Sequence, residues 1–125
     1  MLAPDELSYQ IENTLAFIDA NPVQIALIPR TRLKDGRGTR FQDHPPRVPQ
    51  TFRLTDQSTS RNTWPGMVQT SDGRDRRTDF IMIAAPDAVV ERYDYWVDGD
   101  GQILEVAEIY PDNQYELRAA VVRRD

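Results

Sequence analysis

The acidic turn at residues 98–101 is the first place where residue types and spacing suggest chemistry. Asp98, Asp100 and Gly101 match the opening of a calcium-binding loop. Counted from Asp98, however, the sixth position is Ile103 instead of glycine, and the twelfth is Ile109 instead of a bidentate glutamate. Asp-Gly between two apolar runs is instead a strong hairpin signal. We therefore predict a hairpin turn here and no metal site.

The single histidine, His44, is the next candidate, because an imidazole can act as a general base. No serine or second histidine stands in a recognisable motif with it, and the chain has no cysteine. Gly36 and Gly38 are not followed by the helix and Lys-Ser/Thr pair of a phosphate loop. The last third contains enough carboxylates that their number alone does not exclude a hydrolase with a pair of catalytic acids. They are spread along strand exteriors and turns, however, which is typical of a solvated face. We expect no enzymatic activity and no cofactor.

Residues 30–78 form an arginine-rich segment in which Phe41, Phe52 and Trp64 are interleaved. A basic groove with aromatic platforms is how many barrels hold single-stranded nucleic acid. The interspersed aspartates and a pI of about 4.8 argue against that function. An arginine-rich surface can equally pair with the acidic surface of another copy, which suits a closed ring. Both interpretations remain open on these residues alone.

Charge is distributed unevenly along the chain, whose formal net charge is −5. Residues 1–29 carry four acidic and no basic side chains, residues 30–78 eleven basic and five acidic, and residues 79–125 four basic and eleven acidic. Fourteen of the fifteen basic residues are arginine, which pairs well with carboxylates across protein contacts. A GC-rich gene would give the same arginine bias.

Length and composition bound the fold. A chain of 125 residues supports one domain, and 39% hydrophobic with 28% charged residues is typical of a soluble protein. The absence of cysteine excludes disulfides and thiolate chemistry. No run reaches the length of a membrane span, and no basic residue precedes Arg30, so we expect no secretory signal and the cytoplasm as the compartment.

One helix is predicted over residues 4–19. Pro4 suits the first turn, and Asn-Pro at residues 21–22 ends the helix. The apolar residues at helical spacing are Leu7, Ile11, Leu15 and Ile18. We expect this stripe to lie across a sheet. Docking of part of the helix on a neighbouring subunit is the alternative.

Strands are predicted at residues 23–30 and 49–55, where apolar and polar residues alternate. Residues 31–48 contain turn residues and are expected to form either a protruding hairpin or an ordered long loop. Residues 56–78 are rich in Ser, Thr, Asn, Asp, Gly and Arg and are expected as a long polar loop, with a short strand near residues 67–70 as an option.

The last third is predicted to be an antiparallel meander. We expect strands at residues 79–85, 93–97 and 102–110, a turn at residues 111–113, and a final strand. The first of these is apolar on both faces, and the last has the period of a half-buried strand, with Tyr115, Leu117, Ala119 and Val121 on one face.

The expected fold class is mainly β, a small antiparallel β-barrel or sandwich with an N-terminal α-helix and long loops. One domain, residues 1–125, then contains the helix (1–21), the first strands with a long hairpin or loop (22–55), the polar loop (56–78) and the meander (79–125).

The order of strands and turns resembles a known family. The matching segments are residues 17–22 leading into 25–30, the turn Asp35-Gly36, residues 45–54, Tyr95-Trp96-Val97 with its Asp-Gly turn, and residues 103–106. This pattern is similar to the head-to-tail stopper (head-closure) proteins of long-tailed bacteriophages. The resemblance implies a small barrel with an N-terminal helix and no enzymatic activity. It also implies a place in the virion neck, after assembly in the host cytoplasm.

The resemblance further implies partners. The chain would form a hexameric or dodecameric ring in the virion, between the portal-bound adaptor and the tail. The oligomeric state of the chain alone, monomer or ring, stays open. It would close the DNA channel and dock the tail, and packaged duplex DNA would pass without sequence-specific binding. A tail terminator or another neck or tail component is the nearest alternative, and a single-stranded nucleic-acid-binding β-barrel is the alternative of another class.

Two sets of site residues follow from the resemblance and the charge pattern. A loop of this family plugs the channel, and we prefer residues 56–78 to residues 31–47 because they are longer and more polar. The candidate channel-loop residues are Asp56, Ser58, Arg61, Asn62, Trp64, Asp72, Arg74, Asp75, Arg76 and Arg77. The candidate subunit or adaptor contacts are Arg30, Arg32, Lys34, Arg37, Arg40, Phe41 and Arg47.

Overall fold

A computed structural model describes residues 3–36, 38–56, 67–110 and 114–124. The described residues form one helix and ten strands, so the expectation of a mainly β fold with an N-terminal helix is confirmed. The bounds are α1 (Pro4–Asp19), β1 (Val23–Ile25), β2 (Arg30–Asp35), β3 (Gly38–Asp43), β4 (Gln50–Asp56), β5 (Met67–Gln69), β6 (Asp75–Arg77), β7 (Phe80–Ala84), β8 (Tyr95–Val97), β9 (Ile103–Ile109) and β10 (Leu117–Arg124). No helix in these ranges combines the length and apolar character needed to cross a lipid bilayer.

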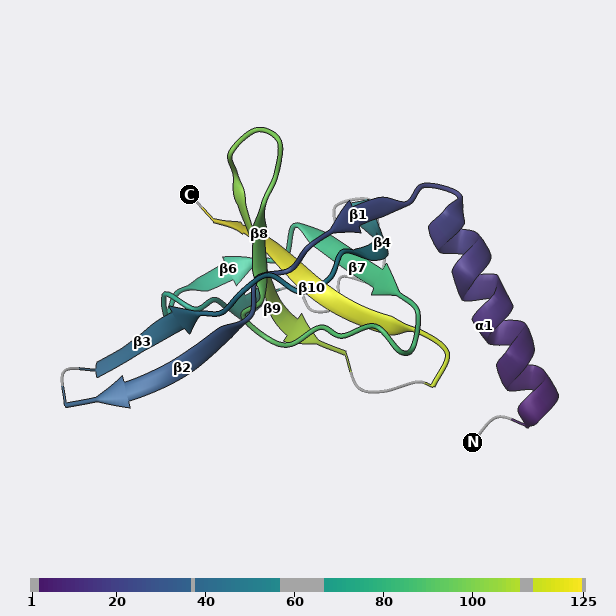
Figure 1. The fold of residues 1–125 in the computed structure, drawn as a ribbon, viewed down its shortest axis with the longest axis horizontal. Helices are drawn as coiled ribbons and strands as arrows, with labels where there is room; N and C mark the ends of the chain where they lie inside the picture. Colours follow the sequence, from purple (N-terminus) through teal and green to yellow (C-terminus); the bar gives the residue numbers. More distant parts are fainter. Residues whose placement is uncertain (1–2, 37, 57–66, 111–113, 125) are drawn as a thin grey trace.

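The body of the molecule is a six-stranded antiparallel sheet in the order β1-β4-β7-β10-β9-β8 (Figure 1). Its two edges meet at Ile28 and Tyr95, whose backbones exchange hydrogen bonds of 2.8 and 3.1 Å. The sheet is therefore nearly closed into a barrel, which reduces the exposed edge that an open sheet would present. Its interior is filled by a core in which Leu27, Phe52 and Met82 are fully buried.

Two elements cover the outside of the barrel. Ile18 of α1 packs on Ile81 and Ile83, the outward residues of β7. The β5–β6 hairpin places Val68 on the outward residues of β9 and β10. The cover that α1 provides explains why β7 is buried on both faces, as its continuous apolar run predicts.

The β2–β3 hairpin protrudes from the barrel at the end opposite to α1 (Figure 1). Its two strands pair in an unbroken register from Arg30 opposite Asp43 to Asp35 opposite Gly38. Of the two structures expected for residues 31–48, the protruding hairpin is therefore present.

Several boundaries differ from the sequence prediction. The strand expected at residues 23–30 ends at Ile25, because the chain leaves β4 there and only Ile28 continues as a bridge to β8. Residues 56–78, expected as a polar loop, contain the β5–β6 hairpin. The turn expected at residues 111–113 lies outside the described residues.

The strand pairing in the last third also differs from the predicted meander. Strands β8, β9 and β10 are consecutive neighbours, but β7 pairs with β4 and β10 and has no ladder with β8. Strand β10 was expected to be half-buried, and this is wrong for residues 119–122, which are buried throughout. The reason is tertiary: Ala120 and Val122, on the outward face, are covered by Val68 of the β5–β6 hairpin.

Candidate functional site

A buried carboxylate lies at the base of the β2–β3 hairpin. The side chain of Glu105 is 0% exposed, in the middle of β9. Its Oε1 accepts hydrogen bonds from Arg30 Nη1 at 3.4 Å and Arg124 Nη1 at 3.1 Å. Its Oε2 accepts one from the backbone N–H of Ser71 at 2.8 Å, and the Ser71 hydroxyl donates to Oε1. A buried charge is tolerated only when it is paired and hydrogen-bonded in this way.

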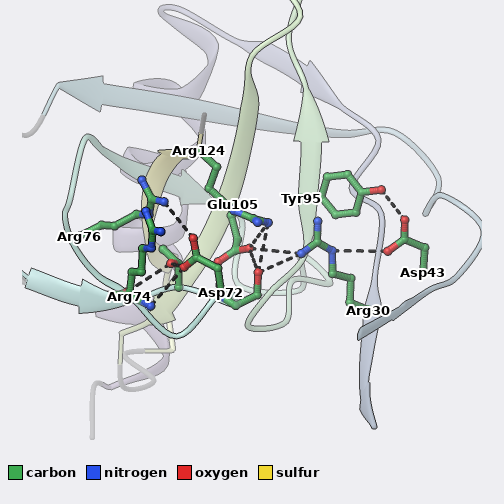
Figure 2. Close-up of polar contacts among 10 residues, drawn as sticks. Arg30, Asp43, Asp72, Arg74, Arg76, Tyr95, Glu105 and Arg124 are labelled. Atoms are coloured by element: carbon green, nitrogen blue, oxygen red, sulfur yellow. Dashed lines mark hydrogen bonds and ion pairs between the residues drawn. The ribbon is translucent and has the colours of Figure 1, made fainter. Parts of the chain in front are cut away.

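We call Arg30, Ser71, Glu105 and Arg124 the Glu105 network. These residues come from the start of β2, the β5–β6 turn, β9 and the end of β10. Figure 2 shows Glu105 between Arg30 on one side and the β5–β6 turn on the other. The network therefore joins the protruding hairpin, the outer hairpin and the C-terminal strand to one point on the barrel.

Arg30 extends the network along the hairpin base. Its guanidinium lies 3.9 Å from the centre of the Tyr95 ring, and its Nε is 3.5 Å from Asp43 Oδ1. The Tyr95 hydroxyl donates a 2.5 Å hydrogen bond to Asp43 Oδ2. This bond to the carboxylate raises the pKa of Tyr95 above its usual value, because it stabilises the neutral phenol. The first pair of hairpin residues is thus fixed to β8 (Figure 2).

The β5–β6 turn is built around a second carboxylate, Asp72. It accepts hydrogen bonds from the Thr70 hydroxyl, from Arg76 Nη2 at 2.9 Å and from the Arg74 backbone N–H at 3.2 Å. The Thr70 bond is the largest of the causes that hold the pKa of Asp72 well below its usual range. Gly73 has a φ of 80°, a backbone conformation that glycine adopts without strain. The turn thereby holds the Ser71 donors against Glu105.

A second buried ion pair holds the segment that follows the hairpin. Asp94 is 1% exposed and accepts hydrogen bonds from Arg47 Nε at 3.0 Å and from the Glu91 backbone N–H at 3.1 Å. Burial raises the pKa of the Asp94 carboxyl, while the bond to Arg47 acts in the opposite direction. Arg47 also donates its backbone N–H to Leu27, so the chain after β3 returns to the barrel wall.

A concavity of about 230 Å³ opens beside the hairpin base. Arg32 and Phe41 line it from the hairpin, Tyr93 lines it from the barrel, and the β5–β6 turn closes the remaining side. The Phe41 and Tyr93 rings meet edge to face with centroids 4.9 Å apart. Tyr93 has a φ of 77°, which is rare for a bulky residue and costs on the order of 1 kcal/mol. The lining also includes Asp72, whose charge is paired with Arg76, so the concavity combines two aromatic rings with polar and charged groups.

The candidate contact residues divide into two groups. Arg30 is held by buried Glu105 and Phe41 packs on Tyr93, so both build the hairpin base. Arg47 is held by buried Asp94 and fixes the segment that follows the hairpin. Arg32, Lys34 and Arg40 are exposed along the hairpin. Arg37 lies outside the described residues.

The candidate channel-loop residues are also divided. Asp72, Arg74, Asp75, Arg76 and Arg77 belong to the β5–β6 hairpin, and Asp56 ends β4. Ser58, Arg61, Asn62 and Trp64 lie outside the described residues. Of the aromatics considered as stacking platforms, Phe52 is 0% exposed in the barrel core and presents no face to a ligand.

Sequence reasoning missed the two buried carboxylates that organise the site. Glu105 had one available signal: it is the one charged residue among the apolar residues 103–107. For Asp94 the sequence carries no comparable signal, because it stands in a polar connection.

Among the described residues, no group of three or more histidine, aspartate or glutamate side chains could hold a metal ion. At the turn of residues 98–101, Asp98 Oδ1 accepts the backbone N–H groups of Asp100 and Gln102, as expected for a hairpin turn.

No family model, curated protein or solved structure matches this chain. We therefore interpret the site from its own contacts and charges.

Proposed function

We propose that the chain is a structural assembly protein of a virion neck, a head-to-tail stopper of a long-tailed bacteriophage. It forms a ring below the portal and adaptor, closes the DNA channel and docks the tail. The observation that carries the proposal is the architecture: a nearly closed barrel with an acidic helix at one end and a basic, protruding hairpin at the other. Unlike surfaces on one subunit are what a heterologous ring requires.

The internal ion pairs support a scaffold role for the hairpin base. Glu105 and Asp94 are both buried and saturated by hydrogen bonds from arginine and backbone groups. A protruding element that contacts other subunits benefits from such a fixed base. If the base were mobile, ordering it on association would cost conformational entropy and weaken binding.

The charge distribution supports a passive channel. Residues 79–125 are strongly acidic, and an acidic surface facing the channel would let duplex DNA pass, because phosphate contacts dominate its affinity for basic surfaces. The basic middle of the chain would then make the subunit and adaptor contacts.

Inactivating the gene in the phage that carries it tests this function. We expect filled heads that lose DNA, free tails and no infectious particles, with recovery when the protein is supplied from a plasmid. Heads that carry unfinished tails would favour the tail-terminator alternative. A normal yield of infectious particles would contradict any neck function.

The exposed basic residues of the hairpin favour a second candidate function, binding of single-stranded nucleic acid. Fluorescence anisotropy with a labelled oligonucleotide tests it. Affinity that falls steeply as salt is raised through the physiological range would favour this function over the stopper.

A further inference from the structure

One face of the β2–β3 hairpin carries positive charge in a regular pattern. Arg32 and Lys34 are two residues apart on β2, so their side chains leave the same face, about 7 Å apart along the strand. Both are exposed. Phe41 is paired with Arg32 across the hairpin and opens into the concavity of about 230 Å³. This face, defined by Arg32, Lys34 and the concavity, we call the basic face.

The helix α1 carries the complementary pattern. Thr14 and Ile18 are its buried residues and mark the side that faces the sheet. On the opposite side, Asp5, Tyr9, Glu12 and Asp19 recur at spacings of four, three and seven residues, which places them in one stripe along the helix. All four are exposed, and Tyr9 retains 63% of its surface. This acidic stripe has an aromatic ring between two carboxylates.

The two patterns place charge close to an aromatic ring. Along a helix, Asp5 and Glu12 lie about 6 and 4.5 Å on either side of Tyr9. On the basic face, Arg32 lines the concavity beside Phe41, and Lys34 lies two residues, about 7 Å, farther along β2. With Tyr9 against Phe41 and Tyr93, one of the two carboxylates, Asp5 or Glu12, would lie within reach of Arg32 and Lys34.

One molecule cannot make this contact with itself, because α1 and the β2–β3 hairpin lie at opposite ends of its long axis (Figure 1). Between two copies the contact joins unlike surfaces. It can therefore be repeated from copy to copy, and it gives a ring when the rotation between copies closes.

We infer that the basic face of the β2–β3 hairpin docks on the acidic stripe of α1 of a second copy, with Tyr9 entering the concavity beside Arg32. The inference rests on the proposed function, because it names the contact between subunits of the neck ring. The net charge of −5 and the acidic stripe on the same chain favour a second copy over nucleic acid as the occupant.

Two charge-reversal variants of the full chain test the contact by sedimentation velocity. The hairpin variant is Arg32→Glu with Lys34→Glu, and the helix variant is Asp5→Lys with Glu12→Lys. We expect the unmodified chain to self-associate at low salt and to dissociate as salt is raised, because exposed charges are screened. Each variant alone should associate roughly a hundredfold more weakly.

An equimolar mixture of the two variants is the decisive sample. The acidic hairpin of one variant meets the basic helix of the other, and the remaining pair is of the original kind, so association should return. Arg40→Glu, on the other face of the hairpin, is the matched control for Arg32→Glu and should leave association unchanged. Tyr9→Ala should weaken association roughly tenfold without a change of charge.

Circular dichroism and urea unfolding establish that each variant is folded. An unmodified chain that stays monomeric up to about 1 mM at low salt would overturn the inference. Reversals without effect, or a mixture that fails to associate, would also overturn it. Oligonucleotide binding that requires Arg32 and Lys34 in a chain that does not self-associate would replace the second copy by nucleic acid. The purified chain reports on this contact alone, whereas gene inactivation reports on the neck function, so the two can fail separately.

Discussion

Glu105 shows how one residue ties the molecule together. It is a charged residue on a strand whose neighbours Leu104 and Val106 are in the core, and it is saturated by Arg30, Arg124 and Ser71. A buried ion pair contributes little net stability compared with a well-packed apolar pair, but removal of one partner leaves the other charge uncompensated. The role of Glu105 is therefore to fix the relative position of the hairpin, the β5–β6 turn and β10.

Replacing Glu105 by glutamine should lower the free energy of unfolding by about 3 kcal/mol, because Arg30 and Arg124 lose their common counter-charge. Urea unfolding at neutral pH measures the loss. Glu108→Gln is the control, since Glu108 is on the same strand and only partly buried, and it should change stability by less than about 0.5 kcal/mol. Equal urea midpoints for the two variants would contradict the role assigned to Glu105.

Asp72 should make stability depend on pH in the acid range. Its pKa in the folded chain is below its value in the unfolded chain, so the carboxylate stabilises the fold above about pH 4, and this contribution is lost as the pH falls below that value. Asp72→Asn should therefore cost about 1 kcal/mol at neutral pH, because the partly exposed charge is screened, and the difference should shrink toward zero near pH 2. Unfolding curves of both proteins at a series of pH values measure this. A difference that stays constant with pH would show that the charge of Asp72 is not involved.

At the scale of elements, the helix was the easiest to predict. Its ends depend on local signals, Pro4 at the first turn and Asn21-Pro22 at the last, and the structure places α1 at the predicted residues. The burial along it was less predictable: Leu15 of the predicted apolar stripe is 43% exposed, while Thr14 is buried. Which residues of a helix are covered depends on where the helix crosses the sheet, and the periodicity of the helix alone does not contain that information.

The strands show the same division between local and tertiary information. The turn signals predicted the β8–β9 hairpin, and the protruding β2–β3 hairpin was one of the two structures expected for its segment. Both hairpins depend on residues that are close together in the sequence. The pairing of β7 with β10 joins distant parts of the chain, and no local pattern specifies it. The full burial of residues 119–122 depends on the β5–β6 hairpin, which was expected only as a short strand in a polar loop. Glu105 could be recognised as unusual from its apolar neighbours, but its partners could not.

The attachment of α1 can be tested through its main buried residue. Ile18 is 3% exposed and packs on Ile81 and Ile83. Ile18→Ala should lower the free energy of unfolding by about 2–4 kcal/mol, because it leaves a cavity between the helix and β7. Hydrogen exchange should also become faster in α1 before it does in the barrel.

Leu15→Ala is the matched control for Ile18, because Leu15 is 43% exposed and loses less contact. It should cost under about 1 kcal/mol. Equal losses for the two variants would mean that the helix is not anchored at Ile18.

At the scale of the whole molecule, the chain has a packed centre and two unlike ends. The centre is the barrel with its buried ion pairs, and the ends are the acidic α1 and the basic hairpin (Figure 1). A molecule of this form suits repeated contacts between copies, and the proposed neck ring uses both ends in each subunit.

Electron cryomicroscopy of virions of the proposed phage tests that account most directly. The account predicts a ring of this chain at the head–tail junction, with the β2–β3 hairpin of each copy lying on α1 of the next and Tyr9 beside Arg32. A neck without this chain would contradict the proposed function. A ring in which the hairpins point away from the neighbouring helices would contradict the contact between subunits.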